Sequence, residues 1–124
     1  MRSIHLSLIA FLALALPVGM AGAQDAASGE RVFKSQCGIC HAIAAGRNMV
    51  GPSLAGIVGR KAGTIPGFRY TDANKNSGLT WDAATLDRYL TNPRAAVPGT
   101  NMAFAGLKAD QQRQDLVAYL TTLH

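Results

Sequence analysis

The strongest constraint in this 124-residue sequence is one short run, Cys37-Gly38-Ile39-Cys40-His41. Residues three positions apart share a face of a helical turn, so both sulfurs can reach one edge of a flat ring. The C-x-x-C-H pattern is the attachment signature of c-type heme, in which the adjacent imidazole lies under the iron. The run therefore predicts one covalently attached heme c, anchored by Cys37 and Cys40, with His41 as an iron ligand.

The residues alone leave three other uses of the two cysteines open. They could form a structural disulfide, or a thioredoxin-like redox pair, which requires a βαβ order that this sequence does not show. A tetrahedral zinc site needs four ligands. Beyond residue 23 the chain offers only four soft or imidazole ligands, Cys37, Cys40, His41 and His124. We favour heme attachment over all three.

The first 23 residues have the three-part pattern of a secretory signal peptide. Arg2 supplies the positive start, residues 6–16 are apolar apart from one serine, and Ala21-Gly22-Ala23 matches a small-residue cleavage site. A membrane-spanning helix needs ~20 apolar residues, and this run is shorter. We expect cleavage after Ala23, with a retained N-terminal anchor as the alternative. The mature domain would be residues 24–124, soluble and exported, which in a bacterium means the periplasm.

The mature domain has few large side chains with which to build a core. The full chain is 48% hydrophobic but only 6% aromatic, and glycine is frequent. A domain of ~100 residues with this composition buries a modest apolar area and often depends on a disulfide, a metal or a cofactor. Composition therefore agrees with a fold that encloses a prosthetic group.

Apolar periodicity and chain breakers predict an all-α fold. We expect helices over about 29–36, 80–91 and 109–124, a single helical turn over 71–76, and a looped segment over 46–67. Asp25 or Ser28 is the expected cap of the first helix, and Thr80 that of the second. Gly29 and Tyr119 could mark a close crossing of the first and last helices, or belong to ordinary core packing.

Several runs spread over the mature chain match one known family. They are Gly29 and Phe33 ahead of Cys37–His41, Gly51–Gly56, Gly59-Arg60, Gly67–Asn76, Leu79-Thr80-Trp81, Tyr89-Leu90, Asn92-Pro93, Pro98–Met102, Phe104-Ala105-Gly106 and Asp115–Leu120. With these runs the chain resembles the small soluble class I cytochromes c, close to the mitochondrial type and its bacterial periplasmic relatives. The resemblance implies the cytochrome c fold: three main helices plus short helical turns and long loops wrapped around one covalently bound heme.

The second axial ligand is the main mechanistic question. From the residues alone, Met49, Met102 and His124 are all candidates. Most methionines fill cores, and we interpret Met49 in that way and His124 as an exposed terminal residue. Met102 follows Pro98-Gly99-Thr100, and the family's ligand is the methionine of this same motif. The resemblance therefore implies that His41 and Met102 are the two metal ligands.

The resemblance also implies roles around the heme. The family uses the proline carbonyl that matches Pro52 to hold the ligand histidine, and a proline has no backbone donor to compete. Three matching positions surround a buried propionate, and four others line the sulfur side and the heme edge. The first set is Arg60, Tyr70 and Trp81; the second is Asn74, Tyr89 and Thr100, which would tune the potential, and Phe104, which would shield the edge.

Two filled axial positions predict an electron carrier and not an enzyme, because the iron keeps no open site for a substrate. We expect a monomer that passes single electrons from a membrane quinol-oxidising complex or periplasmic dehydrogenase to a terminal oxidase, reaction centre or reductase. A heme enzyme or gas sensor, with an easily detached Met102, and a thiol oxidoreductase are the alternative classes.

The charge pattern leaves the redox partner open. Without Arg2 the chain has 11 basic residues against 7 acids, a net charge of +4, which two ionised propionates would lower to about +2. This mild, scattered basicity does not indicate nucleic-acid binding. The mature chain has four lysines, whereas the mitochondrial type has many around the heme edge. Gln36, Ala95 and Asn101 stand where the family often has lysine, and Lys34 and Arg94 remain as candidate docking charges.

Overall fold

The computed structural model describes residues 24–124, so the expected leader over 1–23 lies outside the described residues. Five helices form in this part: α1 (Ala26–Gln36), α2 (Asp72–Lys75), α3 (Ala83–Thr91), α4 (Pro93–Ala96) and α5 (Asp110–Thr121). Residues 24–124 contain no strand, and one isolated bridge joins Lys61 to Thr80. The all-α prediction is confirmed.

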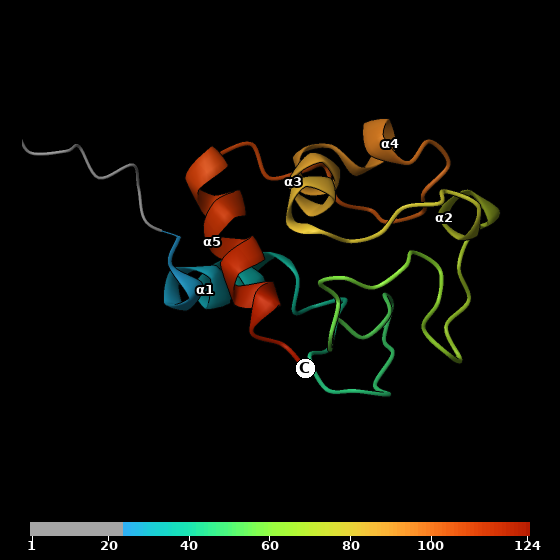
Figure 1. Ribbon diagram of the computed structural model, residues 1–124, viewed down its shortest axis with the longest axis horizontal. Coiled ribbons are helices and arrows are strands. Elements are labelled where there is room, and N and C mark those ends of the chain that lie inside the picture. Colours follow the sequence, from blue (N-terminus) through green and yellow to red (C-terminus); the bar gives the residue numbers. More distant parts are fainter. Residues whose placement is uncertain (1–23) are drawn as a thin grey trace, which may run out of the picture.

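Helices α1 and α5 lie against each other although they come from opposite ends of the domain (Figure 1). Gly29 is buried in this crossing, where an added Cβ would lie 1.9 Å from the Asp115 carbonyl oxygen and 2.8 Å from the Tyr119 Cβ. The Asp115 side chain accepts a hydrogen bond from the Asp25 backbone N–H at 3.0 Å. The expected close crossing at Gly29 and Tyr119 is therefore present, with Asp115 as its third participant.

The helix caps follow the sequence with two corrections. Asp25 is the N-cap of α1, and Thr71 caps the short α2 by accepting from the Asn74 N–H. The expected Thr80 cap is wrong: Asp82 caps α3 by accepting from the Thr85 N–H at 2.8 Å, because Thr80 is held in extended backbone by its pairing with residue 61.

The second correction concerns helix ends. Asn92 ends α3 as expected, but it also begins α4, with Pro93 at the first helical position. A fixed proline φ suits the first turn of a helix, so the same proline stops one helix and starts the next. Helix α5 ends at Thr121 instead of continuing to residue 124.

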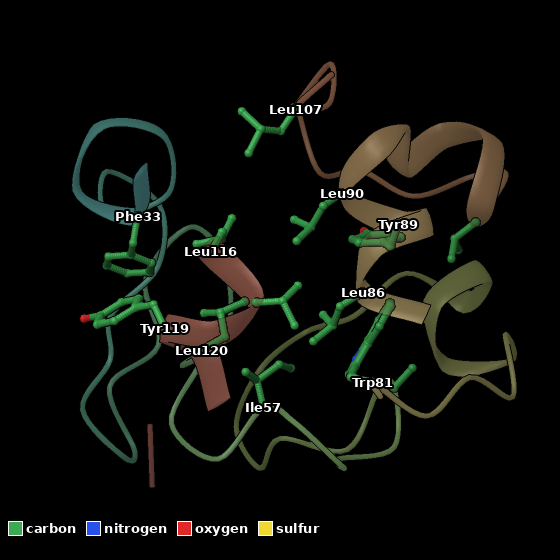
Figure 2. Close-up of a cluster of buried hydrophobic side chains, with 13 residues drawn as sticks. Phe33, Ile57, Trp81, Leu86, Tyr89, Leu90, Leu107, Leu116, Tyr119 and Leu120 are labelled. Atoms are coloured by element: carbon green, nitrogen blue, oxygen red, sulfur yellow. The ribbon is translucent and has the colours of Figure 1, made fainter. Parts of the chain in front are cut away.

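Buried side chains from α1, α3, α5 and the loops meet in one core (Figure 2). Phe33 of α1 packs against Tyr119 of α5 with ring centroids 5.6 Å apart, and Trp81 packs against Tyr89 of α3 at 4.8 Å. Leu116 is fully buried between these groups. The long loop over 38–71 closes the remaining side of the molecule, opposite α3 and α4 (Figure 1). Within residues 24–124, no helix has the length and apolar character needed to cross a bilayer.

Candidate functional site

One cavity lies between the loop over 38–71, helices α3 and α5, and the segment that follows α4. Its volume is about 290 Å³, near the lower end of the ~300–1,000 Å³ typical of small-molecule and cofactor sites. All the site residues expected from the sequence line it: Cys37, Cys40, His41, Pro52, Arg60, Tyr70, Asn74, Trp81, Tyr89, Thr100, Met102 and Phe104. The tertiary structure thus brings residues from positions 37 to 104 to one place.

The C-x-x-C-H run forms a tight turn at the end of α1. Cys37 is the C-cap of the helix, and its carbonyl accepts hydrogen bonds from the N–H groups of Cys40 and His41, both at 3.0 Å. The turn continues the helical winding for a few residues, so both sulfurs and the imidazole reach the same cavity wall. This is the arrangement that the spacing of the run predicts.

The His41 ring is held in one orientation by two neighbours. Its Nδ1 lies 2.8 Å from the Pro52 carbonyl oxygen, so Nδ1 carries the proton and donates. Gly51 packs against the ring so closely that an added Cβ would lie 2.2 Å from the imidazole Cε1. The Gly51 N–H in turn donates to the Cys40 carbonyl at 2.8 Å.

The protonation state of His41 suits metal binding. Burial lowers the pKa of His41, although the hydrogen bond to Pro52 partly opposes this shift. At neutral pH the imidazole is therefore neutral, with Nδ1–H donating to Pro52 and the lone pair of Nε2 available to a metal. The role that the resemblance implies for the Pro52 carbonyl agrees with this geometry.

The cysteines do not have the environment of a reactive redox pair. Both are partly buried and are not joined in a disulfide. Burial raises the pKa of the Cys37 thiol to about 11, whereas nucleophilic cysteines have a lowered pKa. Within residues 24–124, no three His, Cys, Asp or Glu side chains gather into a metal cluster, so the zinc alternative lacks its ligands.

The two methionines of the described chain have different surroundings. Met102 is partly buried, packs against the core and lines the cavity. Met49 is 41% exposed and does not line the cavity, so its interpretation as core filler is wrong. The Met49 N–H donates to the Gly51 carbonyl at 2.9 Å in a turn at the surface, so Met49 belongs to that turn and not to the core. Of these two thioethers, only that of Met102 belongs to the cavity wall.

A hydroxyl pair stands beside Met102. The Tyr89 hydroxyl lies 3.0 Å from the Thr100 hydroxyl, and the Met102 N–H donates to the same Thr100 oxygen at 3.4 Å. Burial raises the pKa of Tyr89, so its hydroxyl stays protonated and is a neutral donor at physiological pH. These contacts connect α3 to the start of the Met102 segment.

Arg60 and Tyr70 line the cavity, and both also form hydrogen bonds with backbone groups of the loop over 38–71. The Arg60 guanidinium donates to the carbonyls of Ser53, at 2.9 Å, and Ala55. The Tyr70 oxygen accepts from the Ile65 N–H at 3.1 Å. These loop contacts were not foreseen from the sequence, since backbone donors and acceptors leave no trace in a residue pattern. An arginine has five N–H donors and a phenol can still donate its proton, so both retain capacity for a bound carboxylate.

The Asn74 side-chain oxygen is the orphan polar atom of the cavity wall: it is buried and, among the described residues, has no hydrogen-bond partner. Buried acceptors are nearly always satisfied in folded proteins. An unpaired one that lines a cavity is typical of a wall completed by a bound group or its ordered water. Together with two thiols, an oriented imidazole and a thioether, this wall fits heme c.

Several residues that line the cavity were expected from the sequence only as core residues. Leu86 and Leu90 of α3 and Leu116 and Leu120 of α5 form the apolar stripes seen in the sequence, and the structure makes them cavity lining as well. Ile57 was missed, because it lies in a glycine-rich loop without periodicity. Ala103 and Phe104 line both the cavity and a neighbouring surface pocket, whose other lining residues are Asn92, Arg94 and Ala105.

Comparison with known proteins decides the family. The family model described as cytochrome c matches residues 26–124. The chain belongs to the cytochrome c family. It is 50% identical to cytochrome c2 of Rhodomicrobium vannielii over 100% of this chain and 98% of the relative, and 56% identical to cytochrome c2 of Blastochloris viridis over 86% and 84%.

A solved structure supports the same assignment. Cytochrome cH from Methylobacterium extorquens superposes with a TM-score of 0.74 and 46% identity, over 79% of this chain and 98% of that one. Like other members of the cytochrome c family, the chain binds one covalently attached heme c with its iron. It is an electron carrier and not an enzyme.

Proposed function

We propose that this cytochrome c is a soluble periplasmic one-electron carrier whose iron is held by His41 and Met102. The observation that carries the proposal is the shared cavity: it is lined by the C-x-x-C-H turn, by a His41 ring oriented through Pro52, and by the Met102 thioether. When bound, heme c supplies the one-electron change between ferrous and ferric iron.

The protein side chains set how that change takes place. A thioether ligand favours the ferrous state and so raises the reduction potential, and exclusion of water by apolar walls acts in the same direction. Ile57, Leu86 and Leu116 contribute such a wall. Because Pro52 and Gly51 hold the imidazole, His41 needs little rearrangement between the two oxidation states. A site of this kind exchanges electrons and leaves no iron position for a substrate.

The partners follow from the same reasoning. We propose transient docking to a membrane quinol-oxidising complex or periplasmic dehydrogenase as donor, and to a terminal oxidase, reaction centre or reductase as acceptor. Cytochromes c2 at 50% and 56% identity support a bacterial exported carrier, and the sequence over 1–23 supports export by a signal peptide, leaving a mature chain of residues 24–124. Lys34, one of the candidate docking charges, is paired with Glu30 at 2.7 Å on the exposed face of α1, which leaves Arg94 as the better candidate.

Replacement of the two methionines tests the axial ligand. Met102→Ala should abolish the weak red absorption band of sulfur-ligated ferric iron and lower the midpoint potential, because the thioether is removed. Met49→Ala is the matched control, since its side chain is exposed and outside the cavity, and it should change neither property. An unaltered spectrum and potential in Met102→Ala would refute His/Met ligation.

A further inference from the structure

The segment between α4 and α5 carries Met102 and has no helical structure of its own over residues 100–109. Within residues 101–106 the Phe104 N–H donates to the Met102 carbonyl at 2.9 Å, but no helix forms, so the segment is positioned mainly by what holds its ends. Its first end is held by the Tyr89–Thr100 hydroxyl pair. Its second end, residues 105–108, meets a separate polar cluster whose side chains do not line the cavity.

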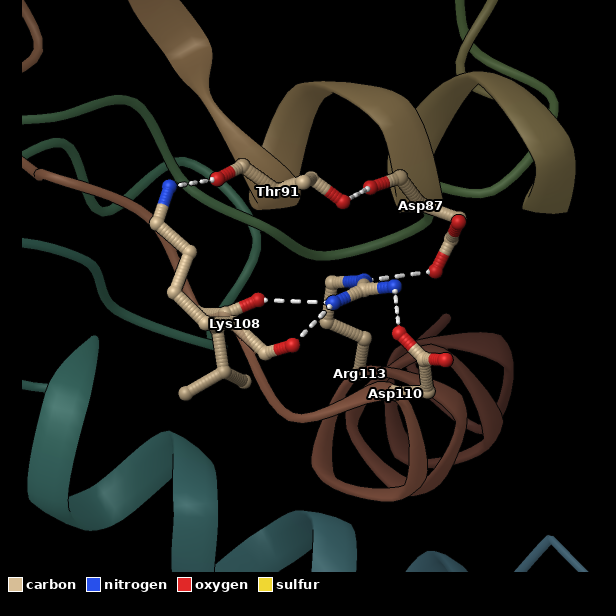
Figure 3. A network of polar contacts seen from close by, with 6 residues as sticks. Asp87, Thr91, Lys108, Asp110 and Arg113 are labelled. Atoms are coloured by element: carbon tan, nitrogen blue, oxygen red, sulfur yellow. Dashed lines mark hydrogen bonds and ion pairs between the residues drawn. The ribbon is translucent and has the colours of Figure 1, made fainter.

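Arg113 is the centre of that cluster (Figure 3). Its side chain is only 8% exposed, and every guanidinium nitrogen has a partner. Nε donates to the Asp87 carboxylate of α3 at 2.8 Å, and Nη2 donates to the Asp110 carboxylate. Nη1 donates to the backbone carbonyls of Leu107, at 2.9 Å, and Lys108, at 3.0 Å. The arginine thus joins α5, α3 and the end of the Met102 segment.

Two further contacts fix the same end to the C-terminal turn of α3. The Lys108 ammonium donates to the Thr91 carbonyl at 2.6 Å, and the Leu107 N–H donates to the Leu90 carbonyl at 2.7 Å. Within the segment, the same ammonium also donates to the Ala105 carbonyl at 3.3 Å. Gly106 has a φ of +109° and passes so near Thr91 that a Cβ would lie 2.1 Å from its carbonyl oxygen. The backbone therefore has little room to shift while these contacts hold.

We infer that Arg113, assisted by Lys108, is a positioning residue that keeps Met102 on the cavity wall by tying residues 107 and 108 to α3. The inference rests on the proposed ligation by Met102. Six residues, 101–106, separate the two residues at which the segment is held, Thr100 and Leu107. If residues 107 and 108 move away from α3, the Met102 thioether is therefore displaced with them. None of the contacts of Arg113 touches the cavity, and its effect on the iron is indirect.

The size of the effect follows from the groups left without a donor. Removing the guanidinium leaves two carbonyls and two carboxylates unpaired, and a hydrogen bond to a charged group contributes more than a neutral one. Asp87 and Asp110 are 44% and 79% exposed, so water replaces part of what they lose. We expect about a tenfold rise in the fraction of molecules with a displaced segment.

Titration of the ferric protein with imidazole measures that fraction. Added imidazole binds the iron only where the thioether has left, so its apparent Kd falls as the displaced fraction rises. Arg113→Met should lower the apparent Kd about tenfold, and Lys108→Met, at an exposed position, about two- to threefold. Arg113→Lys keeps the charge but not the planar guanidinium with donors on three nitrogens, so its apparent Kd should lie between those of Arg113→Met and the wild type.

Two controls separate positioning from general destabilisation. Val32→Ala lowers stability through the α1 side of the core without touching the cavity or the cluster, and it should leave the apparent Kd within about twofold of wild type. In a Met102→Ala background, Arg113→Met should have no effect on imidazole binding, because no thioether remains to be displaced. If Arg113→Met does not fold, Lys108→Met and Asp87→Asn carry the test.

The outcomes distinguish this inference from the ligand assignment. A wild-type Kd in the Arg113 and Lys108 variants, or an equal change in Val32→Ala, would overturn the positioning role while leaving Met102 as the ligand. A wild-type protein without the sulfur–iron absorption band would instead overturn the ligation itself, and the inference with it.

Discussion

Gly29→Ala tests whether the crossing of α1 and α5 holds the domain together. The new Cβ would lie 1.9 Å from the Asp115 carbonyl oxygen and 2.5 Å from its carbon, where an ordinary contact begins at 3.4 Å. The obstacle is helix backbone, so no side-chain rotation can relieve it, and the two helices must separate by about 1.5 Å. Separation also loosens the Phe33–Tyr119 contact and the Asp25–Asp115 hydrogen bond.

The free energy of unfolding should fall in spite of the better helix former. Overpacking of a tight interior costs about 1–3 kcal/mol, and a backbone obstacle lies at the upper end of this range. Alanine in place of glycine inside a helix returns about 1 kcal/mol. The net loss is about 2 kcal/mol, which for a domain of this size corresponds to a Tm lower by about 8–16 °C.

Thermal unfolding followed by far-ultraviolet circular dichroism gives the answer. Ser35→Ala is the matched control, because it changes an exposed position of the same helix and should stay within about 0.5 kcal/mol of wild type. A Gly29→Ala protein that melts within about 2 °C of wild type would refute the close-crossing argument. So would an equally large loss in Ser35→Ala.

Two further predictions concern the site and the helix caps. Gly51→Ala should displace the His41 ring, because its Cβ would lie 2.2 Å from the imidazole Cε1. We expect a shifted midpoint potential by redox titration, with Gly38→Ala, whose Cβ would meet its nearest neighbour at an ordinary 3.5 Å, as the control. Asp82→Asn should make the free energy of unfolding fall less steeply as the pH is lowered. The hydrogen bond from the Thr85 backbone N–H lowers the pKa of Asp82 below 3.8, so its carboxylate stabilises the fold fully above pH 3.8 and progressively less as the pH falls through the folded-state value. Asparagine retains the cap without titrating. The measurement is the free energy of unfolding as a function of pH, and a decline below pH 3.8 as steep in Asp82→Asn as in the wild type would contradict this.

Much of the architecture could be anticipated because its signals are local. Helix periodicity, the Asn92-Pro93 stop and the turn spacing of the C-x-x-C-H run depend on neighbours within a few positions, and α1, α3 and α5 formed close to their expected ranges. The cap of α3 was misassigned because Thr80 and Asp82 are both good caps by residue type. The extended pairing of residues 59–62 with 79–81 decided between them.

The candidate site shows the same division. The sequence by itself determined the heme-binding turn, the all-α class and, through the family resemblance, the twelve expected site residues, all of which line the cavity. Only the tertiary structure placed Met49 at the surface, engaged Arg60 with loop carbonyls, and joined Arg113 to Asp87 across 26 positions. The reason is physical: a hydrogen bond or a cavity contact depends on atoms that folding brings within a few ångströms, and residue spacing along the chain encodes that proximity only within a helical turn.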